Sequence, residues 1–416
     1  MARIQPVRGT HDILPEENRR FRHITNIFSA LAERYGMGQI STPIFEFTEV
    51  FKRTLGDTTD VVTKEMYTFE DRSGDMLTLR PEYTAGIARA FISGGLAQEA
   101  PCKFYGFGPM FRHERPQKGR LRQFHQLDVE ILGVGEPQAD VEVLSIAYDL
   151  LAELGIAKLV TLEINTLGDS DSRAAYRDAL REYFLNFKDA LSEDSLNRLQ
   201  TNPLRILDSK DEGDKKIVAD APEITAFLNP ASAAFFTSVQ EGLRALGIPY
   251  VINPRLVRGL DYYCHTAFEF TTTALGAQGT VLAGGRYDGL IEQLGGPATA
   301  GIGWAAGIER LAMLVEAPEA NPRPVAIVPV GEACQTAALA LAHNLRRQGH
   351  HVEMGYRGNL SKRLKRANKF NASLAIILGD EELAQGIATV RNLDSGDQEE
   401  VPLDRLERHL EPFLKF

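Results

Sequence analysis

The stretch FRHERPQKGRLRQFHQLDVEILG, residues 111–133, decides the fold of this chain. Its second half alternates polar and apolar residues, as a half-buried β-strand does. Leu127, Val129 and Ile131 share one face of such a strand, which we expect to lie against the core. The opposite face is too polar for a core and predicts the floor of a pocket. It carries Arg122, Phe124, Gln126, Asp128 and Glu130.

The first half of the stretch is a basic turn, and it connects this strand to an antiparallel partner expected at residues 103–112. Arg112 precedes the turn and Phe124 follows it. A guanidinium with an aromatic ring suits a triphosphate and a nucleobase. A hairpin with a solvated charged loop is an equally simple interpretation of these residues alone. Other segments of the chain distinguish the two interpretations.

Composition predicts a globular protein of the cytoplasm with two or three domains. The 416 residues are 44% hydrophobic and 25% charged. They contain no apolar stretch long enough to cross a bilayer, and the N-terminus lacks the apolar core of a secretory signal. The three cysteines are far apart, which argues against a disulfide framework and a structural zinc site. We therefore expect no membrane partner.

The net charge of −10 is unusual for a nucleic-acid-binding protein, but the charge is unevenly distributed. Residues 346–369 contain eight basic residues and one acidic residue, whereas residues 370–416 contain four basic and ten acidic residues. This segregation predicts either a local basic patch or an ordinary solvated helix face.

Most of the chain before residue 320 has the pattern of a mixed helix and strand domain. Apolar periodicity predicts helices at 16–36 and 137–154, and a strand, a proline break and a helix within 76–93. A Gly-rich turn or strand that continues into a helix is expected at 301–316. Further strands are predicted at 40–47, 160–168, 249–252, 266–272 and 279–283.

Two segments depart from this pattern. Residues 170–247 are polar, helical and acidic, with a solvated connection at 208–216, and they predict an insertion between two parts of one sheet. A proline-rich linker at 316–324 precedes an alternation of strands and helices in the order βαβαβ. This order predicts a small parallel sheet flanked by helices.

Five separated segments require a joint explanation. They are LRPEYT at 79–84, the stretch at 111–130, LVRGLDYY at 256–263, AGGRYDGL at 283–290 and GIGWAAGIERL at 301–311. Arginines at strand ends suit phosphate groups, and carboxylates beside tyrosines suit a cationic or N–H-bearing ligand.

In this order and spacing, the segments resemble those of bacterial histidyl-tRNA synthetases, a family of class II aminoacyl-tRNA synthetases. ISTPIFEF with Pro43, FRHERPQKGR…RQFHQ, and GIGWAAGIERL with Arg310 resemble the three general class II motifs. LVRGLDYY and AGGRYDGL are particular to the histidyl enzymes. The resemblance covers essentially the whole chain.

The resemblance implies an α+β fold, with a class II antiparallel sheet flanked by helices in a catalytic domain, residues 1–320. It places a helical insertion at about 170–247 and a C-terminal α/β anticodon-binding domain at 325–416. It also implies a cytoplasmic homodimer that contacts its partner through the first motif. The partners would be L-histidine, ATP and tRNA(His).

The implied reaction joins histidine to AMP and then transfers the histidyl group to the 3′ end of the tRNA. The resemblance makes Arg258 and Arg112 the catalytic arginines at the α-phosphate. The ATP-binding set would be Arg112, Glu114, Arg120, Phe124 and Arg310. A Mg²⁺ ion is expected with ATP, although the sequence does not identify its ligands.

The histidine site requires acceptors for the α-amino group and for the imidazole N–H. The resemblance assigns the amino group to Glu82, Thr84 and Gln126. It assigns the imidazole to Glu130, Tyr263 and Tyr287, with Tyr262 beside them. One position departs from the family pattern, because Tyr83 stands where many members carry glycine. That change affects how the backbone of residues 82–84 approaches the ligand.

Contacts with tRNA are expected at two places. The turn that would meet the acceptor end contains Arg115, Lys118 and Arg122. A predicted helix of the C-terminal module would place four basic side chains on overlapping turns as a phosphate-contacting face. These are Lys362, Lys365, Arg366 and Lys369.

Three other functions are weighed against this one. Histidine-binding regulatory subunits of ATP phosphoribosyltransferase share the catalytic fold, but they typically lack the C-terminal module and the Arg258 segment. A class II ligase for another amino acid would not be expected to combine Glu130 with RGLDYY. A tRNA-binding scaffold would not need Arg112, Arg258 and Arg310 together.

Overall fold

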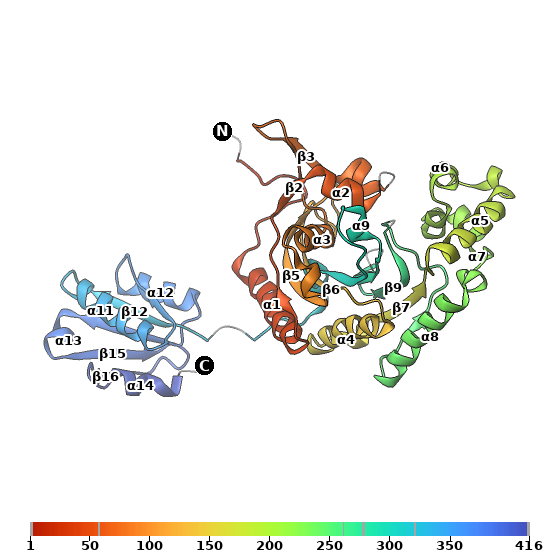
Figure 1. Ribbon diagram of the computed structural model, residues 1–416. Helices are drawn as coiled ribbons and strands as arrows, with labels where there is room; N and C mark the ends of the chain where they lie inside the picture. The colour runs from red at the N-terminus through yellow and green to blue at the C-terminus, as the bar shows by residue number, and fades with distance from the viewer. Residues whose placement is uncertain (1–2, 57–58, 261, 277–278, 320–321, 414–416) are drawn as a thin grey trace. The chain divides into compact units, whose positions relative to one another are not determined.

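The computed structural model describes residues 3–56, 59–260, 262–276, 279–319 and 322–413. The chain divides into two compact units, Met1–Ala317 and Pro318–Phe416 (Figure 1). Each unit has its own hydrophobic core.

An eight-stranded sheet is the centre of the first unit, with the strand order β1-β5-β6-β11-β10-β9-β7-β8. The pairs β1–β5 and β7–β8 are parallel, and the other neighbouring pairs are antiparallel. The predicted hairpin of the 111–133 stretch is confirmed as β5 and β6. The strands are β1 Gly38–Gln39, β5 Cys102–Phe111, β6 Gln123–Leu132, β7 Thr161–Thr166, β8 Val251–Ile252, β9 Cys264–Thr271, β10 Thr280–Arg286 and β11 Gly301–Gly307.

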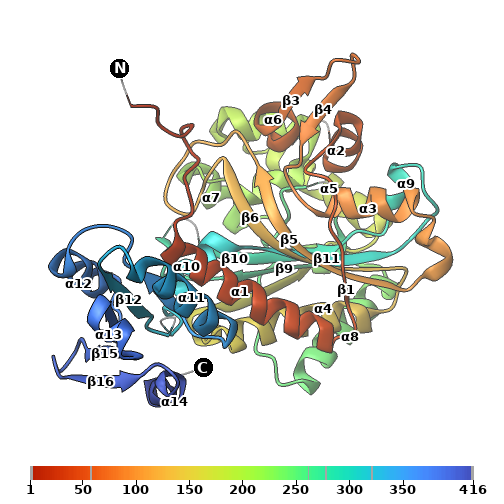
Figure 2. The same ribbon diagram turned by 90° about the vertical axis from the view of Figure 1, so that its left-hand side faces the viewer.

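The two faces of this sheet have different coverings. Helices α1 (Pro15–Arg34) and α4 (Pro137–Glu153) lie side by side across one face, as Figure 2 shows. Leu127, Val129 and Ile131 of β6 are buried in that core, as their alternation predicts. The opposite face of β6 is left for polar side chains, and α3 (Thr84–Ser93) and α9 (Leu290–Gln293) pack at its margin. Helix α10 (Ile308–Leu314) follows β11 directly.

The strand predicted at 40–47 is wrong as a single element. The chain pairs at Gly38–Gln39 with β5, leaves regular structure around Pro43, and pairs again at β2 (Phe45–Phe47) in a different sheet. Proline has no N–H to donate to a strand partner, which explains the interruption. The second sheet has the order β2-β4-β3, with β3 at Tyr67–Glu70 and β4 at Met76–Leu79, and helix α2 is Thr48–Leu55.

The insertion forms a helical module between β7 and β8. Its helices are α5 Ser170–Leu185, α6 Glu193–Thr201, α7 Glu212–Ala219 and α8 Pro230–Ala245. The connection predicted as solvated at 208–216 is mostly exposed, but it includes the start of α7 and Asp214, which is fully buried. Its carboxylate accepts hydrogen bonds from the hydroxyls of Ser192, Ser195 and Ser209, each at 2.6 Å. These bonds lower the pKa of Asp214 to about 2, although burial opposes this shift.

The second unit contains a five-stranded sheet of order β13-β12-β14-β15-β16. The predicted parallel sheet is correct for β13, β12 and β14, but β15 and β16 add two antiparallel strands that the βαβαβ pattern omits. The strands are β12 Val325–Val330, β13 Val352–Met354, β14 Leu374–Gly379, β15 Ile387–Asn392 and β16 Gln398–Pro402. The helices are α11 Cys334–Arg347, α12 Leu360–Lys369, α13 Asp380–Ala384 and α14 Leu406–Leu410.

Candidate functional site

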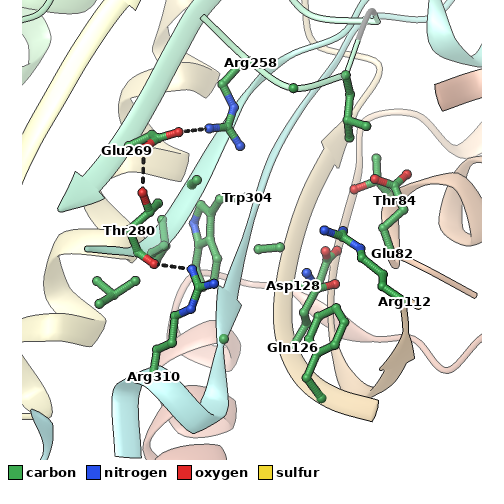
Figure 3. A pocket seen from close by; sticks show the side chains of 18 of the residues that line it. Glu82, Thr84, Arg112, Gln126, Asp128, Arg258, Glu269, Thr280, Trp304 and Arg310 are labelled. Atoms are coloured by element: carbon green, nitrogen blue, oxygen red, sulfur yellow. Dashed lines mark hydrogen bonds and ion pairs between the residues drawn. The ribbon is translucent and has the colours of Figure 1, made fainter. Parts of the chain in front are cut away.

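A cavity of about 390 Å³ lies on the polar face of the large sheet in the first unit (Figure 3). It gathers side chains from all five sequence segments that carry the family resemblance. The residues predicted for substrates that line it are Glu82, Thr84, Arg112, Glu114, Arg120, Phe124, Gln126, Arg258, Tyr262, Tyr263, Tyr287 and Arg310. Glu130 does not line the cavity directly, but its carboxylate accepts a hydrogen bond from the hydroxyl of Tyr287, which does.

Small residues on the neighbouring strands create the space above β6. Gly303 and Ala305 of β11 pair with Glu130 and Asp128, so no large side chain covers either carboxyl group from that side. A Cβ atom at Gly303 would clash with the carboxyl group of Glu130. The glycines of GIGWAAG therefore permit close approach of the backbone to an acidic side chain.

One wall of the cavity is a group of buried carboxyls and phenols. Glu82 accepts hydrogen bonds from the Tyr262 hydroxyl and the Ala85 amide, both at 3.2 Å. Burial raises the pKa of Glu82, although Arg112 opposes the shift. Burial also raises the pKa of Glu130 to about 8. A wall of this kind suits a ligand that carries several N–H donors.

The basic turn contributes a second group of contacts. Arg112 donates from Nε to the carbonyl of Pro81 at 2.9 Å, and its guanidinium lies 5.4 Å from the ring centre of Phe124. Glu114 is buried and forms an ion pair with Arg120. Arg112 and Phe124 both line the cavity. This pairing is the one that the sequence suggested for a phosphate beside a base.

The opposite wall carries Arg258 and Arg310, which approach from different elements (Figure 3). Arg258 forms an ion pair with Glu269 of β9. Burial alone would lower the pKa of Arg258, but the negative charge of Glu269 outweighs burial, so the pKa is raised. Arg310 donates to the carbonyls of Thr280 at 2.6 Å and Gly119 at 3.1 Å. Burial and the neighbouring arginines of the basic turn lower the pKa of Arg310. An anion bound beside this guanidinium would stabilise its charged form.

The cavity is also lined by residues that were not predicted as site residues, among them Asp128, Glu269, Thr280 and Trp304. The sequence pattern could have identified Asp128 as a site residue, because it lies between Gln126 and Glu130 on the polar face of the predicted strand. Glu269 and Thr280 are eleven positions apart in the chain and meet only when β9 and β10 pair, with a hydroxyl-to-carboxylate distance of 2.8 Å. No pattern in the sequence indicates that contact.

Tyr83, the departure from the family pattern, does not enter the cavity. Its side chain is 1% exposed, and the guanidinium of Arg80 lies 4.4 Å from its ring centre. The ring occupies the space above Gly106, where a Cβ atom would come within 3.0 Å of it. The tyrosine thus fills a gap beside β5 and leaves Glu82 and Thr84 at the cavity wall.

The residues predicted to contact the acceptor end differ in accessibility. Arg115 and Lys118 are exposed in the basic turn. Arg122 is half-buried, and it donates from Nε to the carbonyl of Glu114 at 3.2 Å and from Nη1 to that of Arg8 at 3.3 Å. Arg122 thereby fastens the base of the turn to the N-terminal segment, whereas the other two side chains are available to a partner.

The basic residues predicted in the second unit do share one helix. Lys362, Lys365, Arg366 and Lys369 are all exposed on α12, whereas Arg363 of the same helix is buried. The helix begins at the cap Asn359, whose side chain accepts from the amide of Lys362 at 3.1 Å. The exposed face therefore carries a concentration of positive charge.

The described part of the chain has no group of three or more His, Cys, Asp or Glu side chains arranged to hold a metal ion. A search of the same residues finds no helix with the length and hydropathy needed to cross a bilayer.

Comparisons with known proteins agree with this geometry. The family model for histidyl-tRNA synthetase matches residues 9–311, and a model for an anticodon-binding domain matches residues 324–411. Histidine–tRNA ligase of Rhodospirillum rubrum is 62% identical over 100% of both chains. That of Gluconacetobacter diazotrophicus is 55% identical over 99% of both chains.

Solved structures show the same fold. Apo histidyl-tRNA synthetase of S. aureus is similar with a TM-score of 0.81 and 36% identity, covering 98% of this chain and 99% of that one. Histidyl-tRNA synthetase of Nostoc sp. PCC 7120 has a TM-score of 0.69 at 21% identity, covering 99% of this chain and 100% of that one. The chain therefore belongs to the histidyl-tRNA synthetase family, the histidine–tRNA ligases.

Proposed function

We propose that the cavity of the first unit binds L-histidine and ATP side by side, forms histidyl-adenylate, and then transfers the histidyl group to the 3′ end of tRNA(His). The observation that carries this assignment is the division of one cavity into an acidic wall and a basic wall. The acidic wall suits the ammonium and imidazole N–H of histidine. The basic wall suits a triphosphate.

The amino acid would lie over β6. Glu82, Thr84 and Gln126 are assigned to the α-ammonium group, and Glu130, held by Tyr287, to the imidazole N–H. A side chain without an N–H donor would leave one buried carboxylate oxygen of Glu130 without a hydrogen bond, which costs on the order of 1–3 kcal/mol and more for a charged group. This cost would provide discrimination against other amino acids.

ATP would lie across the basic turn and the ends of β9 to β11. Phe124 offers a ring for the adenine, and Arg120 with Arg310 would hold the distal phosphates. Arg112 and Arg258 approach from different walls, so they would hold the α-phosphate between them. As the histidine carboxylate attacks this phosphate, negative charge grows on its oxygens, and fixed guanidinium groups stabilise that state more than the ground state.

Mg²⁺ is expected with ATP. A cation of this kind is commonly bound through substrate phosphates and water with one or two carboxylates. Glu114 lies in the cavity and offers such a carboxylate, although it pairs with Arg120. When bound, the ion would neutralise phosphate charge during adenylate formation.

The tRNA would be held at both units. Arg115, Lys118 and Arg122 are assigned to the acceptor end, and the exposed basic face of α12 to phosphates near the anticodon. On this assignment, residues 1–320 are the catalytic domain and 325–416 the anticodon-binding domain. Contacts with phosphates release counterions, so charging should weaken as salt rises.

We also propose that the protein is a cytoplasmic homodimer. Large apolar side chains are exposed together on the small sheet and the segment before it. They are Ile44 at 44% exposed, and Phe45 at 52%, Phe47 at 58% and Phe69 at 43%, which the strand pairings place on one face of the small sheet. Contiguous exposed apolar surface of this kind is typical of protein interfaces. The measurement is the mass in solution by light scattering.

Histidine-dependent ATP–pyrophosphate exchange tests the site assignment. Replacing Glu130 by Ala removes the acceptor for the imidazole, so kcat/KM for histidine should fall by about 100-fold or more, with little change in KM for ATP. Replacing Glu142 by Ala is the control, because Glu142 pairs with Lys103 outside the cavity. Equal effects on both substrates would contradict the assignment of Glu130 to histidine.

A further inference from the structure

The floor of the cavity contains a carboxyl group that the assignment above does not use. Asp128 lies between Gln126 and Glu130 on β6, and Figure 3 shows it facing the cavity with Glu82 and Arg112 nearby. Its side chain is 0% exposed. Among the described residues, neither of its oxygens has a hydrogen-bond partner. An isolated carboxylate in such a place is unstable, so the group takes up a proton or requires a ligand.

The surroundings supply acceptors and few donors. The strand partners of Asp128 are Gly106 and Ala305, which offer no side-chain donor. Arg80 is the cation that acts on it, but the guanidinium donates to the carbonyls of Thr42 and Pro109, both at 2.9 Å. The titratable and charged groups that surround the site are Glu82, Glu130, Arg80, Arg112, Tyr262, Tyr263 and Tyr287.

Asp128 and Glu130 are two residues apart on the same face of β6, and both carboxyl groups are buried. Two neighbouring buried carboxylates repel one another when both are ionised, so one of them is expected to carry a proton. Burial, followed by the neighbouring Glu130, raises the pKa of Asp128 well above its usual value. The Tyr287 hydroxyl already donates to Glu130, which favours the ionised form of that residue. Asp128 has no such donor, so it is the member of the pair that retains a proton more strongly.

We propose that Asp128 is a specificity-determining residue of the histidine site, which carries a proton in the empty cavity and releases it when histidine binds. This inference rests on the function proposed above. The O–H bond of Asp128 breaks, its electron pair stays on the carboxylate, and the proton passes to the solvent. The α-ammonium and imidazole N–H groups of histidine then supply the donors that the two carboxylates lack.

Selectivity follows from this exchange. When histidine binds, its N–H donors take the place of the proton on Asp128, so both carboxylates can be ionised. An amino acid with an apolar side chain supplies the ammonium group alone, and the second buried charge stays uncompensated. Apolar amino acids that are otherwise of suitable size are therefore rejected by two carboxyl groups rather than by Glu130 alone.

Calorimetry of L-histidine binding to the full chain at pH 7 tests the proposal. The titration is repeated in phosphate and in Tris, whose protonation enthalpies differ, and the difference in heat gives the number of protons released. We expect the wild type to release most of one proton for each histidine bound. The Asp128→Asn variant keeps an N–H donor for Glu130 but has no proton to lose, so its release should fall by most of that amount.

The apparent affinity should show the matching pH dependence. Because binding releases a proton, histidine affinity of the wild type should rise with increasing pH, and Asp128→Asn should show a flatter profile after correction for free histidine. Asp149→Asn is the matched control. Asp149 lies on α4, and its carboxylate accepts a hydrogen bond from the Tyr35 hydroxyl at 2.6 Å. Proton release by this variant should therefore stay as in the wild type.

A second measurement does not depend on any variant. The infrared difference spectrum between free and histidine-bound wild-type protein should show the loss of a protonated carboxyl band. Equal proton release by the wild type and Asp128→Asn, or no change in that band, would overturn the role of Asp128. Failure of the wild type to bind histidine would instead contradict the proposed function.

Discussion

Replacing Arg258 by Ala separates a catalytic role from a structural one. The side chain is 15% exposed and is held by Glu269, so its guanidinium is fixed before substrates bind. Removing one preorganised group that stabilises developing charge typically lowers kcat by about 100-fold to 1,000-fold, or roughly 3–4 kcal/mol. We therefore expect the rate of histidine-dependent ATP–pyrophosphate exchange to fall by this factor, whereas histidine still binds.

The stability effect should be smaller. Glu269 would lose its charged partner but keep the hydrogen bond from Thr280, at 2.8 Å. Its side chain is 21% exposed, so water reaches part of the carboxylate. We expect a loss of about 1 kcal/mol in the free energy of unfolding, measured by denaturant titration.

Glu269→Gln is the matched control for this experiment. The amide can still accept from Thr280 and contact Arg258, but the negative charge is gone. If Arg258 acts on the α-phosphate, this control should lose less than about tenfold in exchange rate. The reasoning is refuted if Arg258→Ala retains exchange within a few-fold of the wild type, or if Glu269→Gln is equally damaged at unchanged histidine affinity.

Three further predictions concern different parts of the chain. Gly303→Ala should raise KM for histidine at least tenfold in the exchange assay, because the new methyl group displaces Glu130; an unchanged KM would contradict the geometry. Asp214→Asn should destabilise the protein by about 2–4 kcal/mol in urea. Since the pKa of Asp214 is lowered to about 2, its stabilisation is present above about pH 4 and lost as the pH falls towards 2, so the two proteins should converge there. Replacing Lys362 and Lys365 together by Gln should raise KM for tRNA and make charging less sensitive to salt, without affecting exchange; a parallel loss of exchange would argue for a structural role.

The sequence predicts elements well where one periodic pattern determines one buried face. The alternation of Leu127, Val129 and Ile131 predicts β6 and its orientation, because each of these side chains has only one apolar side to occupy. The break at Pro43 and the antiparallel strands β15 and β16 are not predicted. Both depend on which partner strand is available, and pairing between distant strands leaves little local signal.

The candidate site shows the same division. Residues that belong to recognisable motifs, such as Arg112 and Arg258, are identified by resemblance and do line the cavity. Glu269 is not identified, because its relation to Arg258 and Thr280 exists only after the strands pair. Asp214 is misassigned to a solvated connection, since a charged run gives no indication that one member is turned inward to three hydroxyls.

ATP–pyrophosphate exchange, with each of the twenty amino acids offered separately to the full chain, tests the central claim most directly. It reports the activation step alone and therefore examines the acidic and basic walls of the cavity without tRNA. The structure predicts exchange with histidine and background rates with the other nineteen. Exchange with another amino acid, or no exchange in protein that still binds histidine, would contradict the account.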